Sequence, residues 1–263
     1  MFNLPFLQSA IASFPIQALR YFPQIPSTNT EGLRLLEAAS PGGNLLLLTE
    51  EQTAGRGRFS RQWHSRPDDS LTFSLVLPNL GFLPQEQTGL IALAGAVAVL
   101  EAIQRTTSLL PQIKWPNDVL VNSKKVCGIL AEAVWDGSML RGVVLGVGIN
   151  VGVSSLPPAD LLRYPATSLQ AETNTPLSRE NLLISFLERF FHWLPQLSEP
   201  GFLDCYQNHL AFIQESVNIF NEAGQKTQQG IVQGIDSQGN LILLDRNGKT
   251  IVCSAGEITI RPA

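Results

Sequence analysis

The chain has 263 residues, of which 44% are hydrophobic and 15% charged, a composition that excludes a disordered or fibrous protein. Its formal net charge of -4 argues against binding to nucleic acid through a broadly basic surface. The three cysteines, Cys127, Cys205 and Cys253, form no CxxC pair. This spacing disfavours a disulfide framework or a zinc site and predicts a reducing compartment, the cytoplasm.

The amino-terminal segment does not look like a targeting peptide. Residues 1–14 are apolar, but they contain no basic residue and are interrupted by Pro5. The longest apolar run, residues 91–100, ends at Glu101 and is shorter than the roughly 20 residues that cross a bilayer. We therefore expect a buried core helix there and no contact with a membrane.

Helices and strands are mixed in the first part of the chain. A helix is predicted over residues 28–39, with Thr28, Asn29 or Thr30 as its cap. A buried strand over 44–49, a loop over 52–67, a strand over 70–77 and a long apolar helix over 87–105 follow. This order favours an α+β fold over a doubly wound one.

Short strands and two further helices come next. Residues 119–121 and 126–134 flank a turn at 122–125 and predict a hairpin. A strand over 141–151 precedes an irregular, proline-containing stretch over 153–167. An amphipathic helix is predicted over 178–194 with Ser178 as its cap, and a shorter one over 202–210.

From about Ile213 onward only short strands are predicted. Turn-forming residues recur at 236–240 and 245–249, which is the spacing of a small antiparallel barrel. We place a domain boundary at residue 212, between a main domain of residues 1–212 and a small barrel domain of residues 213–263.

The arginine loop, residues 52–67, carries the most informative pattern. It contains no acidic residue, and its arginines are Arg56, Arg58, Arg61 and Arg66. Gly55 and Gly57 permit close approach of the backbone to a ligand, and guanidinium groups bind phosphate or carboxylate through two hydrogen bonds. The loop has neither the GK[ST] ending of a P-loop nor a GxGxxG pattern. It predicts an anion site, with a solvated basic loop and a nucleic-acid patch as alternatives.

Two further segments carry polar residues around predicted strands. Residues 114–118 read Lys-Trp-Pro-Asn-Asp, and Lys125 and Gly128 follow in the hairpin. Asp118 could orient a lysine or hold a magnesium ion, whereas the lysines could equally belong to a solvated turn. We expect Trp115 and Cys127 in the core.

The third segment, residues 146–150, reads Gly-Val-Gly-Ile-Asn. Its glycines could admit a flat ligand against the strand, and the amide of Asn150 could contact a base edge. Glycine in a strand also marks a bulge, so this segment alone is a weak signal.

Together and in this order, these segments resemble the biotin–protein ligase family. Five motifs carry the resemblance. The first three are Ser27-Thr28-Asn29, the loop from Gly55 to Trp63, and residues 114–118 together with Lys125 and residues 128–130. The last two are residues 146–150 and a C-terminal pattern made of the turn at 234–239 and Gly-Glu-Ile at 256–258. Ser60 stands where the family loop has glycine. Some family members carry an amino-terminal DNA-binding domain, and the roughly 20 residues before the first motif would not hold one, so we expect no repressor role.

The resemblance implies a fold and an activity. The fold is a central mixed β-sheet with flanking helices on one side, like that of class II aminoacyl-tRNA synthetases, followed by a small SH3-like barrel. The activity is to activate biotin as biotinyl-5'-AMP, with ATP and Mg²⁺, and to transfer biotin to one lysine of a biotin carboxyl carrier protein of acetyl-CoA carboxylase. No nucleic acid or membrane partner is implied. The family contains monomers and dimers, and an exposed sheet edge could serve a second copy or the acceptor.

The resemblance also implies roles for individual residues. The catalytic set is Arg56, Arg58, Lys125 and Asp118. The biotin-binding set is Ser27, Thr28, Asn29, Gln52, Arg56, Gly57, Arg58, Lys125 and Gly128. The ATP-binding set is Arg58, Arg61, Trp63, Lys114, Asn117 and Asn150, and no metal ligands are implied. Three alternatives stay open: a lipoate–protein ligase, a non-catalytic nucleotide- or biotin-binding module, and a family member that binds biotin without transferring it.

Overall fold

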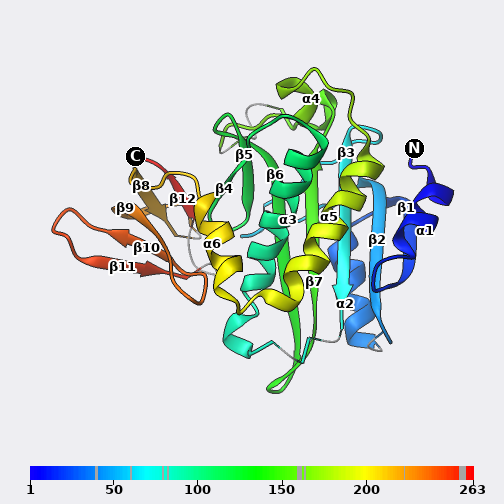
Figure 1. The fold of residues 1–263 in the computed structure, drawn as a ribbon, viewed down its shortest axis with the longest axis horizontal. Helices are drawn as coiled ribbons and strands as arrows, with labels where there is room; N and C mark the ends of the chain where they lie inside the picture. Colours follow the sequence, from blue (N-terminus) through cyan, green and yellow to red (C-terminus); the bar gives the residue numbers. More distant parts are fainter. Residues whose placement is uncertain are drawn as a thin grey trace.

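The structure is a computed structural model, and it describes residues 1–38, 41–59, 61–78, 80–81, 83–158, 162, 164–221, 223–254 and 259–263. The strands form a seven-stranded sheet and a five-stranded sheet, with helices packed mainly against the larger one (Figure 1). No helix of the described residues has the length and apolarity needed to cross a membrane.

The large sheet has the strand order β1-β2-β3-β7-β6-β5-β4. In chain order its strands are β1 Ile16–Ile25, β2 Asn44–Gln52, β3 Ser70–Leu77, β4 Gln112–Lys114, β5 Asp118–Val121, β6 Lys124–Asp136 and β7 Met139–Asn150. The β1–β2 pair is parallel and the other pairs are antiparallel, so the predicted mixed sheet is confirmed.

The helices precede, separate and follow these strands. They are α1 Leu4–Ile11, α2 Thr28–Ala38, α3 Leu90–Thr106, α4 Leu169–Glu172, α5 Arg179–Trp193 and α6 Pro200–Asn208. Short 3-10 turns are η1 Gln85–Gln87, η2 Val153–Ser155 and η4 Leu194–Gln196. Ser178 caps α5 as predicted, because its side chain accepts a hydrogen bond from the Asn181 N–H.

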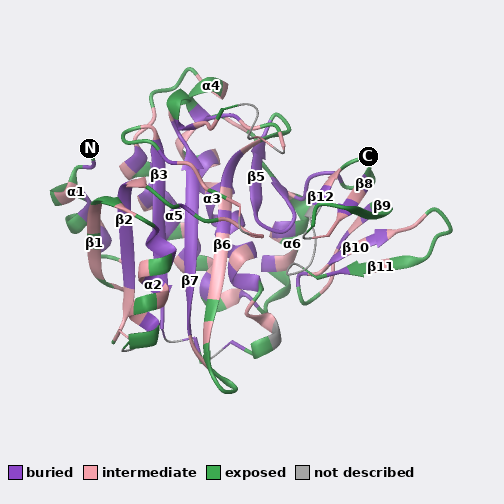
Figure 2. Ribbon diagram, turned by 180° about the vertical axis from the view of Figure 1, so that it is seen from behind, coloured by how far each residue is buried: buried purple, intermediate pink, exposed green. Residues whose placement is uncertain are grey.

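Helices cover both faces of the large sheet, which corrects the expectation that they lie on one side. Side chains alternate between the two faces along a strand. Leu46 and Leu48 of β2 belong to the main core with α3 and α5, whereas Leu45 and Leu47 form a second cluster with Leu36 of α2. Figure 2 shows β2, β3 and β7 buried along most of their length between these layers.

No helix or strand was predicted in the first 25 residues, which contain α1 and the edge strand β1. The burial of β1 follows no clean alternation, and Pro23 lies within it, so neither strand signal is present. The predicted cap of α2 is also corrected by one position. The Ser27 hydroxyl accepts from the Thr30 N–H at 3.3 Å, and Thr28 already lies in the helix.

The small sheet contains β8 Ser216–Phe220, β9 Lys226–Ile235, β10 Leu241–Leu244, β11 Thr250–Cys253 and β12 Thr259–Pro262, in the order β11-β10-β9-β8-β12. All of its pairs are antiparallel, consistent with an SH3-like domain. Among the described strands β11 and β12 do not pair, so the sheet is open rather than the closed barrel expected. Both predicted turns are present, with Gly239 and Gly248 at φ 78° and 76°.

Two buried hydrogen bonds join the small sheet and α6 to residues 114–118. The Trp115 indole N–H donates to the Gly239 carbonyl at 2.9 Å, and the Tyr206 hydroxyl donates to the Pro116 carbonyl at 3.0 Å. Trp115 is fully buried, as predicted, and the Trp115–Pro116 peptide bond is cis. The segment that carries Lys114 and Asp118 is therefore hydrogen-bonded both to α6 and to the turn between β9 and β10 of the small sheet.

Candidate active site

A cavity of about 120 Å³ lies between the start of α2, the end of β2, the arginine loop and the middle of β6 and β7. All nine residues predicted to bind biotin line it, as does Asp118 of the predicted catalytic set. Of the residues predicted to bind ATP, Arg58, Arg61, Trp63, Lys114 and Asn117 line the same cavity. Motifs that are up to about 120 positions apart in the chain, from Ser27 to Gly148, therefore meet in one place.

The described part of the arginine loop folds back on itself. The Gly57 N–H donates to the Arg61 carbonyl at 2.7 Å, and the Trp63 N–H donates to the Gly55 carbonyl at 3.0 Å. A Cβ atom on Gly55 would lie 2.4 Å from the Trp63 carbonyl oxygen, so glycine is needed where the two arms of the loop meet. Ser60, the departure from the family pattern, lies outside the described residues.

The arginines of this loop reach different partners. An Arg56 Nη atom lies 2.8 Å from Glu132 Oε2. The Arg58 guanidinium lies 4.8 Å from the centre of the Phe59 ring, and its Nη1 lies 3.4 Å from Asn117 Oδ1. Arg66 is exposed and lines neither of the two cavities, unlike the other three arginines.

A buried carboxylate between two lysines forms the most highly charged part of the cavity. Asp118 Oδ2 lies 2.8 Å from Lys114 Nζ, and Asp118 Oδ1 lies 2.5 Å from Lys125 Nζ. Antiparallel pairing sets this geometry, because Lys114 and Asp118 are opposite each other on β4 and β5, and Lys125 is the second residue of β6, which pairs with β5. Only 4% of Lys114 and 9% of Asp118 is exposed, which contradicts the alternative of a solvated lysine turn for Lys114.

Burial and the neighbouring charges shift the pKa values of Asp118 and Lys114 in opposite directions. Burial opposes ionisation of Asp118, but the two lysines together hold the pKa of its carboxyl well below the usual range. Burial lowers the pKa of Lys114, and Asp118 partly counters that effect. Because each oxygen of Asp118 contacts a lysine, the geometry favours its orienting role over magnesium binding. No group of three metal-ligating side chains occurs within the described residues.

The strand glycines at the site accommodate side chains of the protein itself. Gly128 and Gly148 are paired across β6 and β7. A Cβ on Gly148 would lie 2.2 Å from the Trp63 indole, and a Cβ on Gly146 would lie 2.0 Å from Asn29 Oδ1. The glycines of residues 146–150 therefore make room for Trp63 and Asn29, where the sequence suggested a flat ligand.

Two polar side chains that the sequence did not single out, Ser74 and Glu132, contact residues that line the cavity without lining it themselves. The Ser74 hydroxyl lies 2.7 Å from both Thr28 Oγ1 and Asn29 Oδ1. The Asn29 amide donates to the Leu130 carbonyl at 3.1 Å and to Glu132 at 2.8 Å. Ser74 and Glu132 lie inside predicted strands, where nothing in the pattern distinguishes them from other strand residues.

A second cavity, of about 350 Å³, adjoins the first and shares Arg61, Trp63, Lys114, Asp118 and Lys125 with it. Asn150 of the predicted ATP set lines this second cavity, and its amide donates to the Thr167 carbonyl at 3.2 Å. His64, Tyr164 and Arg261 also line it. Tyr164 lies in the stretch predicted as irregular and Arg261 on β12, so the sequence offered no signal that either belongs to the site.

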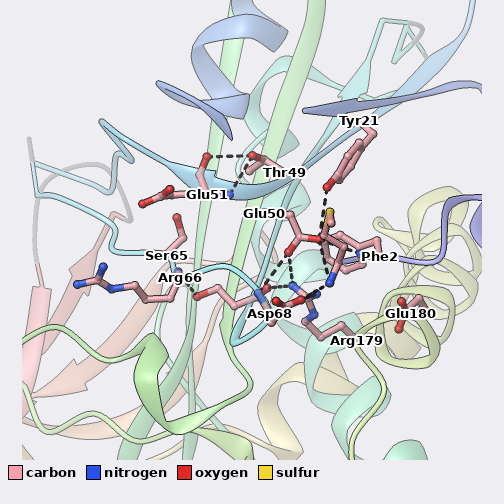
Figure 3. A network of polar contacts seen from close by, with 12 residues as sticks. Phe2, Tyr21, Thr49, Glu50, Glu51, Ser65, Arg66, Asp68, Arg179 and Glu180 are labelled. Atoms are coloured by element: carbon pink, nitrogen blue, oxygen red, sulfur yellow. Dashed lines mark hydrogen bonds and ion pairs between the residues drawn. The ribbon is translucent and has the colours of Figure 1, made fainter. Parts of the chain in front are cut away.

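A polar cluster joins β2, α5 and Asp68, the residue directly after the arginine loop (Figure 3). Arg179, at the start of α5, donates to Glu50 of β2 at 2.8 Å and to Asp68 at 3.0 Å. Arg179 is only 8% exposed and Glu50 only 3%. Because a buried charge is costly without a partner, these contacts fix the residues that follow the loop against β2 and α5.

Comparison with known proteins agrees with this arrangement. Residues 21–150 match the biotin/lipoate A/B protein ligase family, and residues 215–261 match the biotin protein ligase C-terminal domain. The biotin–[acetyl-CoA-carboxylase] ligase of Paracoccus denitrificans is 34% identical over 87% of this chain and 95% of its own length. The bifunctional ligase/repressor BirA of Bacillus spizizenii is 33% identical over 91% of this chain and 73% of its own length.

A solved structure extends the comparison to the fold. The biotin protein ligase of Aquifex aeolicus, in complex with biotin and ATP, superposes with a TM-score of 0.76 and 27% identity over 94% of this chain and 100% of that one. The sequence matches and the shared architecture agree with the motifs that meet in the cavity. The chain belongs to the biotin protein ligases of the biotin/lipoate A/B protein ligase family.

Proposed function

We propose that this chain joins biotin and ATP into biotinyl-5'-AMP, releases pyrophosphate, and transfers biotin to one lysine of a biotin carboxyl carrier protein. The observation that carries the proposal is the convergence of Lys114, Lys125, Asp118 and the arginine loop on one cavity. The family relationship supports the same reaction. The residue roles and the acceptor are our inference.

The first step brings together two anions, the biotin carboxylate and the α-phosphate. The carboxylate oxygen attacks phosphorus, and the bond to pyrophosphate breaks. Lys125, oriented by Asp118, contacts the carboxylate and the α-phosphate, and Lys114, Arg58 and Arg61 face the phosphate chain. Fixed positive charge stabilises negative charge that develops in the transition state and needs no reorganisation as it does so. Mg²⁺ bound to the phosphates of ATP would supply further positive charge for this step.

We assign the remaining roles to residues that line the two cavities. Ser27, Thr28, Asn29, Gln52 and Gly128 surround the rings of biotin, and Arg56, Gly57 and Arg58 close over it. Asn117, Asn150 and Trp63 form the nucleotide end, towards the second cavity. Closure of the arginine loop would keep water from the mixed anhydride.

The second step needs no nucleophile from the enzyme. The acceptor lysine amine attacks the acyl carbon, the bond to AMP breaks, and an amide forms. Cys127 is buried beside the cavity, and burial raises the pKa of its thiol far above the usual range, so it is unsuited to act as a thiolate. We infer a cytoplasmic location, which the three free cysteines support.

The decisive experiment incubates the chain with biotin, MgATP and a carrier domain and measures the intact mass of the carrier. We expect the addition of one biotinyl group. A parallel reaction with lipoate tests the alternative substrate, and modification by lipoate alone would overturn the proposal. Arg56→Ala and Lys125→Ala should each greatly slow biotin-dependent exchange of pyrophosphate into ATP. Exchange at the wild-type rate in both variants would refute the roles proposed for these residues.

A further inference from the structure

A ring of polar contacts joins four residues that line the first cavity, Thr28, Asn29, Gln52 and Arg56, to Ser74 and Glu132, which do not line it. It runs from Thr28, whose N–H and hydroxyl donate to Gln52 Oε1 at 2.8 and 3.1 Å, through Ser74 and Asn29 to Glu132. Glu132 then pairs with Arg56 at 2.8 Å. Arg56 is four positions after Gln52 in the chain, so the backbone of residues 53–55 completes the ring.

The buried members of the ring are rigidly placed. Only 2% of Thr28, 5% of Asn29 and none of Ser74 is exposed. The close contact of Gly146 with Asn29 leaves the asparagine side chain little room to move. In contrast, 41% of the Arg56 side chain is exposed and the arginine belongs to a loop, so it is the member of the ring that is easiest to displace.

Glu132 is the one carboxylate among these six residues, and it contacts both a fixed member and the mobile one. Its Oε2 accepts from the Asn29 amide and from Arg56. It lies on β6 seven positions after Lys125 and, unlike Lys125 and Asp118, does not line the cavity. The carboxylate therefore neutralises the charge of Arg56. It also links the arginine loop to Asn29, one of the residues proposed to surround the rings of biotin.

We propose that Glu132 is a positioning residue which, through Arg56, holds the arginine loop closed over biotinyl-AMP and so sets how long the intermediate stays bound. The inference rests on the proposed function. Glu132 lines neither cavity, so it is not placed to touch the reacting carboxylate or the phosphate. Its loss should therefore affect retention of the intermediate far more than its formation.

Glu132→Gln tests the proposal, because the amide oxygen can still accept from Asn29 while the charge opposite Arg56 is removed. The adenylate is formed on the enzyme from biotin and MgATP, and its dissociation is followed in a chase without carrier. We expect dissociation about three- to tenfold faster than in the wild type, which corresponds to about 0.7–1.4 kcal/mol, with pyrophosphate exchange within about twofold. Glu31→Gln, which breaks the exposed ion pair with Arg34, is the matched control and should change neither rate.

A double-mutant cycle separates this role from a structural one. Because Arg56 variants should form the adenylate slowly, biotinyl-5'-AMP prepared chemically is bound to each variant of the cycle directly. If Glu132 acts through Arg56, then Glu132→Gln should add nothing to the dissociation rate in an Arg56→Met background, and thermal unfolding should be the same in the presence and absence of the second substitution. If the effects of the two substitutions on the dissociation rate multiply, or if Glu132→Gln leaves that rate unchanged, the role given to Glu132 is overturned while the proposed function stands. A wild-type chain that forms no adenylate would instead overturn the proposed function and this inference together.

Discussion

Lys125 Nζ lies 2.5 Å from Asp118 Oδ1, across the first residues of the β5–β6 hairpin. The other oxygen of the same carboxylate contacts Lys114. One buried carboxylate thus aligns two cations along a single side of the cavity. The carboxylate offsets the repulsion between the two ammonium groups, so both lysines can face the anionic groups of the substrates.

Asp118→Asn removes the charge between these lysines and leaves two partly or fully buried cations without a carboxylate partner. We expect a loss of about 3 kcal/mol in unfolding free energy by urea denaturation, and a greatly reduced pyrophosphate exchange rate. Asp136→Asn is the control, because the pair of Asp136 with Arg141 is exposed and should contribute less than about 1 kcal/mol. Equal effects of the two substitutions would contradict the role given to Asp118.

Gly148→Ala should displace Trp63, because the added Cβ would lie 2.2 Å from the indole. We expect a destabilisation of about 1–3 kcal/mol and weaker binding of ATP, measured by calorimetry. The control is Gly201→Ala in the exposed first turn of α6, where a Cβ meets nothing within 4 Å. That substitution should be neutral or stabilise the protein by up to about 1 kcal/mol. If Gly148→Ala binds ATP as tightly as Gly201→Ala, Trp63 does not need the space that the glycine provides.

Tyr206→Phe should destabilise the protein by about 1–2 kcal/mol, because the buried Pro116 carbonyl loses its hydrogen-bond donor. Tyr21→Phe serves as the comparison, since the hydroxyl of Tyr21 makes only a long contact, 3.4 Å, with Glu50. Chemical unfolding of both variants measures the difference. The Michaelis constant for ATP should rise in Tyr206→Phe alone, since this tyrosine supports the segment between Lys114 and Asp118.

Glu172 links α4 to the hairpin turn that precedes Lys125. Hydrogen bonds from Thr167 and Asn122, with Lys124 nearby, lower the pKa of Glu172 below its ordinary value of 4.5. The ionised carboxylate therefore contributes stability above that value, and the contribution disappears as the pH falls through the lowered pKa. Urea unfolding of wild type and Glu172→Gln should differ most at neutral pH and converge as the pH falls through the lowered pKa of Glu172. Glu37→Gln, at an exposed carboxylate, should show a much smaller difference across the same range.

Much of the fold could be predicted because local patterns are strong. The alternation of residues 70–77 predicted β3 with the bounds that it has, and the long apolar run predicted α3. The α1 helix was missed although its start signals are local, since the Asn3 side chain accepts a hydrogen bond from the Phe6 N–H and a proline lies in the first turn. The β1 strand was missed because its stability comes from pairing and packing at the sheet edge. The position of α2 on the second face was also missed, since amphipathicity identifies a helix's buried side but not which face of a sheet covers it.

The sequence by itself determined the family, the identity of the charged groups and the order in which they occur. The arginine loop, the lysines with Asp118, and the two asparagines were all identifiable from residue types and spacing. Only the tertiary structure decided which of these groups touch. The contacts of Arg56 with Glu132, of Trp63 with Gly148 and of Asp118 with two lysines depend on strand register across the large sheet. Register is set by packing between distant segments, so Tyr164, Arg261 and Glu132 entered the site only once the sheets were in place.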